Sequence, residues 1–266
     1  MKRKKPLLFA ISLFIVSSVC SQKKIYIDEN MKIIDSLLFS EKCKASVLKC
    51  LSYNTDTLEI NKILYSYSFK KISKKQFHQL RKFWSIETKK KIDSNTTLII
   101  QYRDTLYNYD INYARHIKHT KNHTEAKHLK FTLKKHLSNI KRWEKRQEKC
   151  IKKLSKKSKA NAIYTYKHAF ENTLSEYKTI KWVKDRGMSK NYFFKINYNY
   201  QVVIVKPNGN YFLSGGHLDK TMLKRLLKKN DWASFRNDLK KSYQSLHKTG
   251  YGLFKQVKGY HKDHCF

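Results

Sequence analysis

The segment 201–228, QVVIVKPNGNYFLSGGHLDKTMLKRLLK, specifies a strand, a tight turn, a second strand and a helix. Residues 202–205 are apolar at every position, which is typical of a central strand covered on both faces. Residues 207–209, Pro-Asn-Gly, supply the turn, because proline presets φ at the first central position and glycine accepts the left-handed position that follows. Residues 211–213 then return as the partner strand, so the segment predicts an antiparallel hairpin.

A helix is predicted directly after the hairpin. Two glycines at 215–216 end the second strand, and Asp219 stands where a side chain would cap the first turn of a helix. Leu218 and Leu223 flank that turn with the spacing of a hydrophobic staple. The hairpin and its capped helix therefore form one unit of an α/β fold.

The first residues have the pattern of a secretory signal. A basic head at residues 2–5 precedes thirteen mostly apolar residues, 7–19, which are too few for a bilayer span of about 20 residues. We expect cleavage before Gln22, which would export the mature chain to the periplasm or the medium. A lipid anchor on Cys20 is the alternative, although Val19 is a poor match to the small residue that such processing needs. No later segment has the length and apolarity that predict a transmembrane helix.

The chain is strongly basic. Its 58 Lys and Arg against 20 Asp and Glu give a net charge of +38, and removing the four basic residues of the signal from this total leaves +34. A charge of this size attracts polyanions such as nucleic acid, anionic lipid or acidic polysaccharide, and it carries no information about the fold. The expected partner is therefore a polyanion or a protein of the cell envelope.

Four cysteines remain in the mature chain: Cys43, Cys50, Cys150 and Cys265. An even number in an exported protein favours disulfides, with three possible pairings. Cys43 and Cys50 on one helix would lie about 10 Å apart, so their pairing requires a helix break between them. No spacing among the four matches a zinc site or a Cys-x-x-Cys redox pair.

Outside the hairpin, apolar residues at helical spacing predict helices, and alternating or continuous apolar runs predict strands. Residues 103–123 show no clear element. The expected elements are a helix over 28–51, a strand over 63–69, a helix over 73–84 that begins with a capping box of Ser73 and Gln76, a strand over 96–102, a long helix over 124–157, a strand over 160–166, a helix from 170 to a stop near Gly187 and, after the hairpin unit, a helix from Asp231.

From residue 63 the elements run β-α-β-α-β-α-β-β-α, which indicates a three-layer α/β domain. This order resembles the thioredoxin-like fold superfamily: TTLIIQY (96–102) is similar to its central strand, ANAIYTY (160–166) to the parallel neighbour, and 202–227 to the closing antiparallel hairpin and helix. The resemblance implies a thioredoxin-like α/β/α domain over 63–229. Around it, the residue patterns predict a signal peptide (1–21), an N-terminal helical extension (22–62), and a C-terminal helix and tail (230–266).

Two departures from the family's pattern imply that its dithiol chemistry is absent. Redox members carry Cys-x-x-Cys after the central strand, where this chain has RDTLYNY (103–109), and a cis-proline before the hairpin, where it has Asn-Tyr-Gln (199–201). The chemistry needs a reactive thiolate beside a resolving thiol. We therefore expect a redox-inactive member.

The outer face of the predicted helix 124–157 is the main candidate for a binding surface. Residues 124–159 hold 14 Lys or Arg against 3 Glu, a local net charge of +11. One interpretation is a solvated lysine face. The other is an electrostatic dock for a polyanion, to which Trp143 would add stacking and the arginines bidentate contacts. The predicted anion-binding residues are Arg142, Lys145, Arg146, Lys149 and Lys153.

Two further groups have less specific patterns. His116, His119 and His123 could share a helix face and bind Zn²⁺ or Cu²⁺, or they could form a solvated His-rich loop, since no carboxylate or thiol accompanies them. Arg103 and Asp104 follow the predicted central strand, at the end where α/β folds place ligands, although an aspartate in a turn is the more common case. We assign no catalytic residue, metal or cofactor.

The sequence thus favours an exported, redox-inactive, thioredoxin-like protein that acts as a binding or structural module at the cell envelope rather than as an enzyme. Two alternatives stay open. One is a thiol oxidoreductase that uses a lone Cys150, the only candidate thiol inside the domain. The other is a polyanion-binding effector or nuclease that exploits the positive charge.

Overall fold

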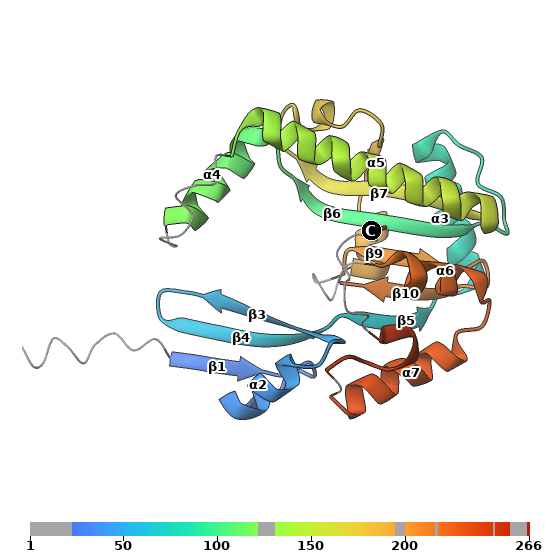
Figure 1. Ribbon diagram of the computed structural model, residues 1–266. Helices are drawn as coiled ribbons and strands as arrows, with labels where there is room; N and C mark the ends of the chain where they lie inside the picture. The colour runs from blue at the N-terminus through green and yellow to red at the C-terminus, as the bar shows by residue number, and fades with distance from the viewer. Residues whose placement is uncertain (1–22, 122–130, 195–199, 216–217, 247, 256–264) are drawn as a thin grey trace, which may run out of the picture.

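The computed structural model describes residues 23–121, 131–194, 200–215, 218–246, 248–255 and 265–266. The expected signal peptide, its cleavage site and Cys20 lie outside these residues. The described part is a mixed α/β structure with one four-stranded and one six-stranded sheet (Figure 1). None of the helices in it combines the length and the apolar character that crossing a membrane requires.

The four-stranded sheet is built from the N-terminal part of the chain. Its strands lie in the order β2-β1-β4-β3, with β1 parallel to β4 and the other pairs antiparallel. The elements are β1 (Lys23–Ile27), β2 (Ile33–Ile34), α2 (Ser36–Cys43), β3 (Leu48–Asn54) and β4 (Leu58–Tyr65).

The N-terminal helical extension predicted over 22–62 is therefore wrong, and of the helix expected over 28–51 only the short α2 is present. The side chain of Asp28 accepts the backbone N–H groups of Asn30 and Lys32, which closes a tight turn where the long helix was expected to begin. The apolar spacing that suggested the helix leaves Met31 and Leu37 exposed. In this segment the apolar spacing did not mark a buried helix face.

The six-stranded sheet brings together the segments that were predicted to form its centre. Its order is β5-β10-β9-β6-β7-β8. Strands β6, β7 and β8 are parallel, whereas β9 is antiparallel to β6 and to β10, and β5 is antiparallel to β10. The strands are β5 (Tyr67–Lys71), β6 (Thr97–Leu106), β7 (Ala160–Ala169), β8 (Trp182–Lys184), β9 (Val202–Val205) and β10 (Asn210–Ser214).

The predicted hairpin is confirmed. Val205 pairs with Tyr211 across the turn. Gly209 has a φ of +84°, the left-handed conformation that the turn was expected to need. A β-carbon at this position would collide with the backbone carbonyl of Ile72. The turn is therefore packed against the end of β5 and requires glycine.

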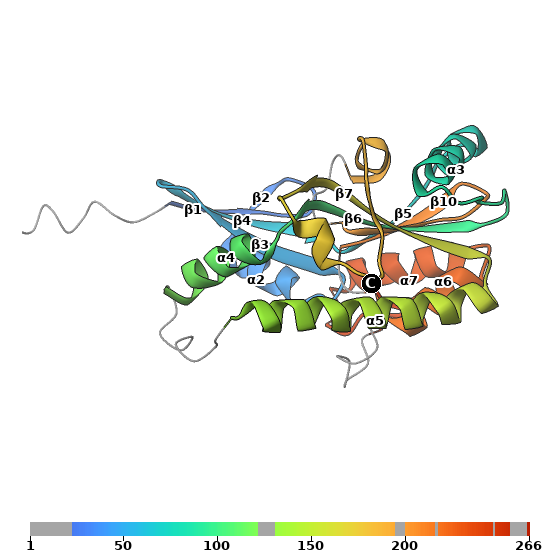
Figure 2. The ribbon, with the colours of Figure 1, turned by 90° about the horizontal axis from the view of Figure 1, so that it is seen from above.

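Helices cover both faces of the large sheet (Figure 2). Helix α3 (Lys74–Thr88) lies on one face and begins with the predicted capping box of Ser73 and Gln76. Helices α5 (Leu133–Lys157), α6 (Lys220–Lys228) and α7 (Ala233–Gln244) lie on the other, and Asp219 caps α6 as expected. Alternate residues of β6 enter two separate cores: Leu98 and Ile100 pack with α3, and Ile99 packs with α6.

Three further segments differ from the predicted elements. The described part of the segment 103–123, which ends at residue 121, forms regular elements, because β6 continues to Leu106 and is followed by α4 (Tyr109–Lys121). The helix expected from residue 170 is instead a 3-10 turn, η2 (Thr173–Glu176), then β8, then a π-helical turn, η3 (Lys190–Phe194). The single strand expected over 63–69 is two strands, because the chain passes from β4 to β5 at Ser66.

The four cysteines of the described residues form two disulfides, Cys43–Cys50 and Cys150–Cys265. Cys43 ends α2 and Cys50 lies on β3, so the break that this pairing requires is present. Cys150 of α5 is bonded to Cys265, 115 residues later in the chain. The second disulfide therefore ties the C-terminal residues to the helical layer.

Candidate anion-binding groove

Helix α5 combines a buried stripe with a basic outer surface. His136, Glu144, Gln147 and Cys150 recur at helical spacing and are all buried. Leu137, which follows His136, is 39% exposed. The residues predicted to bind anions are all exposed: Arg142, Lys145, Arg146, Lys149 and Lys153.

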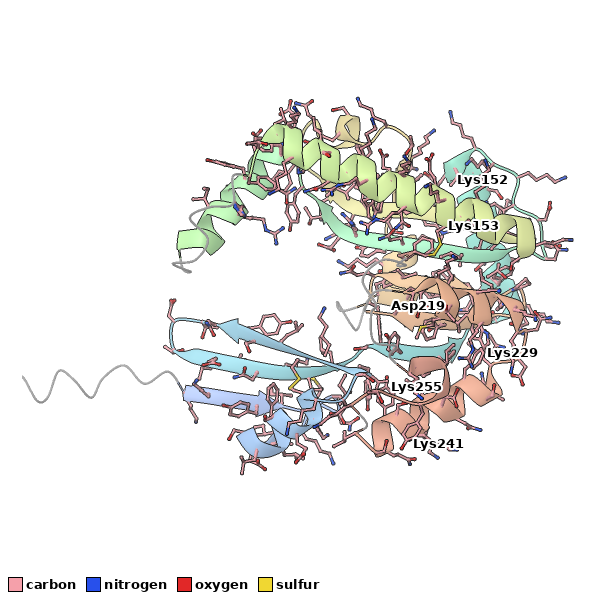
Figure 3. All side chains as sticks on the ribbon, in the orientation of Figure 1. Lys152, Lys153, Asp219, Lys229, Lys241 and Lys255 are labelled. Carbon is pink, nitrogen blue, oxygen red and sulfur yellow. A yellow bond between two sulfur atoms is a disulfide. The ribbon has the colours of Figure 1, made fainter. Side chains whose placement is uncertain are left out.

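The five predicted residues do not form a single patch. Lys145 and Lys149 line a groove between α5 and the edge of the large sheet, and the other three do not. Lys152, which lines the groove, and Lys153, which does not, are consecutive residues of α5 (Figure 3). A basic residue of α5 therefore lines the groove only when it lies on one flank of the helix.

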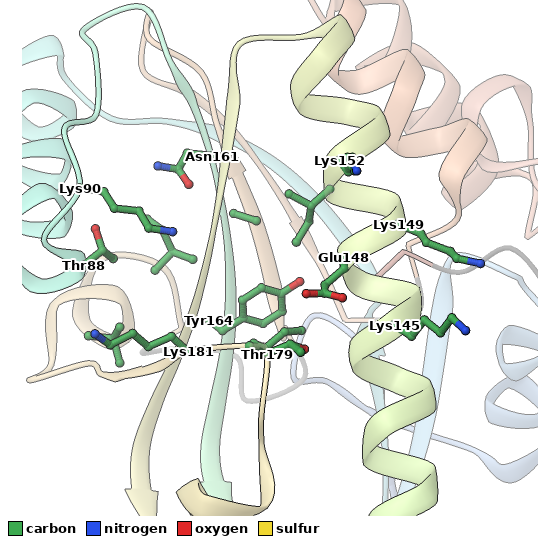
Figure 4. Close-up of a pocket in the computed structure, with 15 residues that line it drawn as sticks. Thr88, Lys90, Lys145, Glu148, Lys149, Lys152, Asn161, Tyr164, Thr179 and Lys181 are labelled. Atoms are coloured by element: carbon green, nitrogen blue, oxygen red, sulfur yellow. The ribbon is translucent and has the colours of Figure 1, made fainter.

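The groove has a volume of about 750 Å³ and lies where α5, β7, the segment before β8 and the end of α3 meet (Figure 4). Its lining contains one acidic residue, Glu148. Figure 4 shows the side chain of Lys90 extending toward the strands, the carboxylate of Glu148 pointing from α5 toward Tyr164, and the side chains of Lys145 and Lys149 extending on the side of α5 away from the strands. The lysines of the lining, all exposed, are Lys90, Lys145, Lys149, Lys152 and Lys181.

The floor of the groove is mainly apolar. Ile151, Ile163 and Val183 contribute to it. At its inner end the hydroxyl of Tyr164 donates a hydrogen bond of 3.0 Å to Oε1 of Gln147. Burial raises the pKa of Tyr164 above the ordinary value of a tyrosine, so the phenol is neutral and adds no negative charge to the site.

Glu144 shapes the groove from within. Its buried carboxylate accepts the backbone N–H groups of Thr179 and Ile180, both at 2.9 Å. These bonds hold the segment before β8 against α5. As a result, β8 pairs with only residues 164–166 of β7, and the groove opens where the two segments diverge.

Four of the five groove lysines form no ion pair with the described residues. These four are Lys90, Lys145, Lys149 and Lys181. Several like charges around one concavity produce a positive potential that raises the local concentration of anions. The arrangement suits a ligand with several negative charges and some apolar surface.

Arg103 and Asp104 do not form a site together, because consecutive residues of a strand point to opposite faces of the sheet. The guanidinium of Arg103 lies over the rings of Trp143 and Trp182, with its central carbon 5.4 Å from each ring centroid. Asp104 accepts a hydrogen bond from the hydroxyl of Tyr102 and lies 3.5 Å from Nζ of Lys190, on the other face. Both positions belong to β6 and not to a turn.

The histidine hypothesis gains no support from the described residues. His116 lies on α4 and stacks on Phe131, with a centroid distance of 5.2 Å. The side chain of His119 and all of His123 lie outside the described part of the chain. Across the described ranges no three His, Cys, Asp or Glu residues are grouped as metal ligands.

A different histidine has an acidic partner. Nε2 of His136 lies 2.8 Å from Oε2 of Glu176, and the other carboxylate oxygen accepts the backbone N–H of Tyr109 at 2.9 Å. The pair joins α5, η2 and the start of α4. The cluster therefore explains how α4 is held in place.

The hypothesis of a lone reactive Cys150 is wrong, because Cys150 is bonded to Cys265 and is buried. A thiol oxidoreductase of that kind needs an accessible thiolate. The segment that follows the centre of β6 contains no cysteine. Among the described residues there is no cis peptide bond.

The basic helix was predictable from the sequence, whereas the other walls of the groove were not. Lys90 and Lys181 come from connections that the sequence did not distinguish from other lysine-rich segments. Glu144 did leave a signal: it is an acidic residue on the apolar stripe of a helix, where a carboxylate requires partners.

No family model matches the chain, and no curated protein and no solved structure matches it.

Proposed function

We propose that the protein is an exported, redox-inactive binding module on a thioredoxin-like frame, and that it holds an acidic partner in the groove between α5 and the edge of the large sheet. The observation that carries this proposal is the groove itself, where five lysines and one glutamate surround a mainly apolar floor.

The strand arrangement supports the thioredoxin-like frame. The resemblance implies a central strand with one parallel neighbour and a closing antiparallel hairpin followed by a helix. Strands β6, β7, β9 and β10 and helix α6 have these relationships within one sheet. The helices on both faces of that sheet are in keeping with a three-layer domain.

The cysteines support a binding role in an oxidising compartment. All four in the described residues are used in disulfides, which are typical of exported proteins. No thiol is left at the end of β6 for exchange chemistry. Export also accounts for the basic and apolar residues that precede the described part.

Two matched double variants test the proposal. Lys145→Glu/Lys149→Glu reverses two charges of the groove, and Arg146→Glu/Lys153→Glu reverses two charges on the same helix outside it, so both variants change the net charge equally. Fluorescence anisotropy with labelled poly-L-glutamate at about 0.15 M salt, where the screening length is about 8 Å, compares them. We expect the groove variant to bind at least tenfold more weakly than the control variant. Equal losses would reduce the interaction to general attraction by a basic surface, and no loss in either would overturn the proposal.

A further inference from the structure

The edge of the large sheet is uncovered along the groove. Strand β7 pairs with β6 on one side from end to end, but on its other side β8 covers only residues 164–166. In the part of the chain that the structure describes, no strand pairs with residues 160–163 on that side. Four residues of strand, a length of about 13 Å, therefore lie open beside the lysines.

The backbone of Ala162 faces this opening. The carbonyl of Tyr166 accepts the N–H of Asp185 at 2.8 Å, so Tyr166 turns its backbone groups toward the β8 side. Backbone groups alternate in direction along a strand, and Ala162, four positions earlier, therefore turns its N–H and C=O to the same side. Ala162 also lines the groove. A strand edge with this geometry is a template for another strand.

Lysines stand on both faces of the open edge. Lys145, Lys149 and Lys152 belong to α5, which covers one face of the sheet, and Lys90 follows α3, which covers the other. Side chains of a strand added to β7 would alternate between these two faces. With acidic residues at alternate positions, all of the acidic side chains would lie on the face of α5, where Lys145, Lys149 and Lys152 stand.

We propose that the occupant of the groove is an extended acidic segment of a partner protein, which pairs with residues 160–163 of β7 as an added strand. This inference rests on the proposed function and specifies the partner. Main-chain hydrogen bonds to Ala162 supply affinity, as in other cases of strand addition, and the lysines select acidic side chains.

The chemistry of the groove favours a peptide over a nucleic acid. A phosphodiester backbone would satisfy the lysines, but it has no N–H group to donate to the carbonyl of Ala162. A peptide strand satisfies both, and aliphatic side chains between its acidic residues can pack on Ile163 and Val183. The edge and the charges together therefore define one kind of ligand.

Backbone methylation of the ligand separates strand pairing from charge. A labelled peptide of alternating Glu and Val is compared with the same peptide methylated at alternate backbone nitrogens, in both possible registers. The methylated peptides keep every charge and lose the donors of one edge each. We expect one register to bind the wild-type protein at least tenfold more weakly than the parent peptide. Equal binding of all three peptides overturns strand addition and leaves the proposed function intact.

A variant of the protein also separates the contribution of strand pairing from that of charge. Ala162→Pro removes the N–H that faces the groove, while the bonds of β7 to β6 are kept, and Ala162→Ser retains the N–H as the matched control. We expect a tenfold or greater loss of peptide affinity for the proline variant and near wild-type affinity for the serine variant. If the proline variant does not fold, as judged by circular dichroism, the comparison of methylated peptides on the wild-type protein decides.

Two further outcomes have separate meanings. If Lys145→Glu/Lys149→Glu leaves the affinity for the parent peptide unchanged, the proposed function fails together with this inference. If a single-stranded oligonucleotide of the same charge binds more tightly than the parent peptide, the partner is a nucleic acid and the strand-addition inference alone is overturned.

Discussion

The carboxylate of Glu144 holds the backbone N–H of Ile180 at 2.9 Å, on the buried side of the helix whose outer side carries the basic residues. The same oxygen accepts the N–H of Thr179. The inner surface of α5 thus fixes the segment that bounds the groove, and the outer surface supplies part of its charge. A single helix sets both the shape and the potential of the site.

Replacing Glu144 tests this relationship. We expect Glu144→Gln to lower the free energy of unfolding by about 2 kcal/mol, because the amide oxygen of glutamine can still accept both N–H groups but lacks the charge that strengthens these buried hydrogen bonds. Amide hydrogen exchange at residues 179–181 should accelerate as well. The control is Glu148→Gln, an exposed position one turn away, with an expected change within about 0.5 kcal/mol. Unchanged exchange at 179–181 would show that Glu144 does not hold this segment.

Lys206 gives the fold a dependence on pH. Its side chain is buried, Nζ donates to the carbonyl oxygen of Leu227 at 2.7 Å, and burial lowers the pKa of Lys206 to about 8. The unfolded chain therefore holds this proton up to a higher pH than the folded chain, and stability rises as the pH increases from about 8 to about 10.4. Lys206 lines a cavity of about 480 Å³, which lets solvent reduce the effect, so we expect a gain of about 1–2 kcal/mol.

Chemical denaturation at pH 7 and pH 10 measures this gain. Other lysines also lose charge at high pH, and for that reason the wild type is compared with Lys206→Met. The difference between the two proteins isolates the contribution of Lys206. A Lys206→Met protein that gains as much stability as the wild type between the two pH values would contradict the prediction.

The two disulfides should contribute unequally to stability. Cys150–Cys265 closes a loop of 115 residues and Cys43–Cys50 a loop of 7. Because the entropy that a cross-link removes from the unfolded chain grows with loop length, we expect a loss of about 4–5 kcal/mol for Cys150→Ala/Cys265→Ala and about 2.5 kcal/mol for Cys43→Ala/Cys50→Ala. Denaturant unfolding of both variants tests the order, and the reverse order would contradict the prediction from loop length.

Gly209 should not tolerate a side chain. Its φ of +84° disfavours other residues, and a β-carbon would meet the carbonyl of Ile72. We expect Gly209→Ala to destabilise the protein by at least about 2 kcal/mol. Pro207→Ala, in the same turn but without this restriction, should cost less than about 1 kcal/mol. Thermal unfolding of the two variants compares them, and equal effects would argue against the close approach of the turn to Ile72.

The parts of the fold that were correctly predicted depend on residues close together in the sequence. The turn at residues 207–209 and the cap at Asp219 depend on residues next to one another, and both appear as expected. The apolar runs that became β6 and β7 are also local signals, although each strand is longer than predicted.

The parts that it missed depend on distant partners. Strand β1 pairs in parallel with β4, with Lys23 opposite Leu58, and no sequence pattern in either segment identifies the other as its partner. The segment expected to be helical from residue 170 is held instead by contacts with α5 and α4. Thr179 donates to Glu144 of α5, and Glu176 contacts His136 of α5 and the backbone of Tyr109 at the start of α4. The groove has the same origin, because Lys90 and Lys181 meet α5 only in the folded chain.

Ser66 alone connects β4 to β5. Its backbone N–H donates a hydrogen bond to the carbonyl of Val47, just before β3, and its carbonyl accepts the N–H of Gly215, just after β10. A fragment that began at residue 63, the expected domain boundary, would cut through β4 and expose the apolar side chains beneath it. A fragment made for expression should therefore contain both sheets. A connection of one residue also offers a protease no extended linker to cleave at this junction.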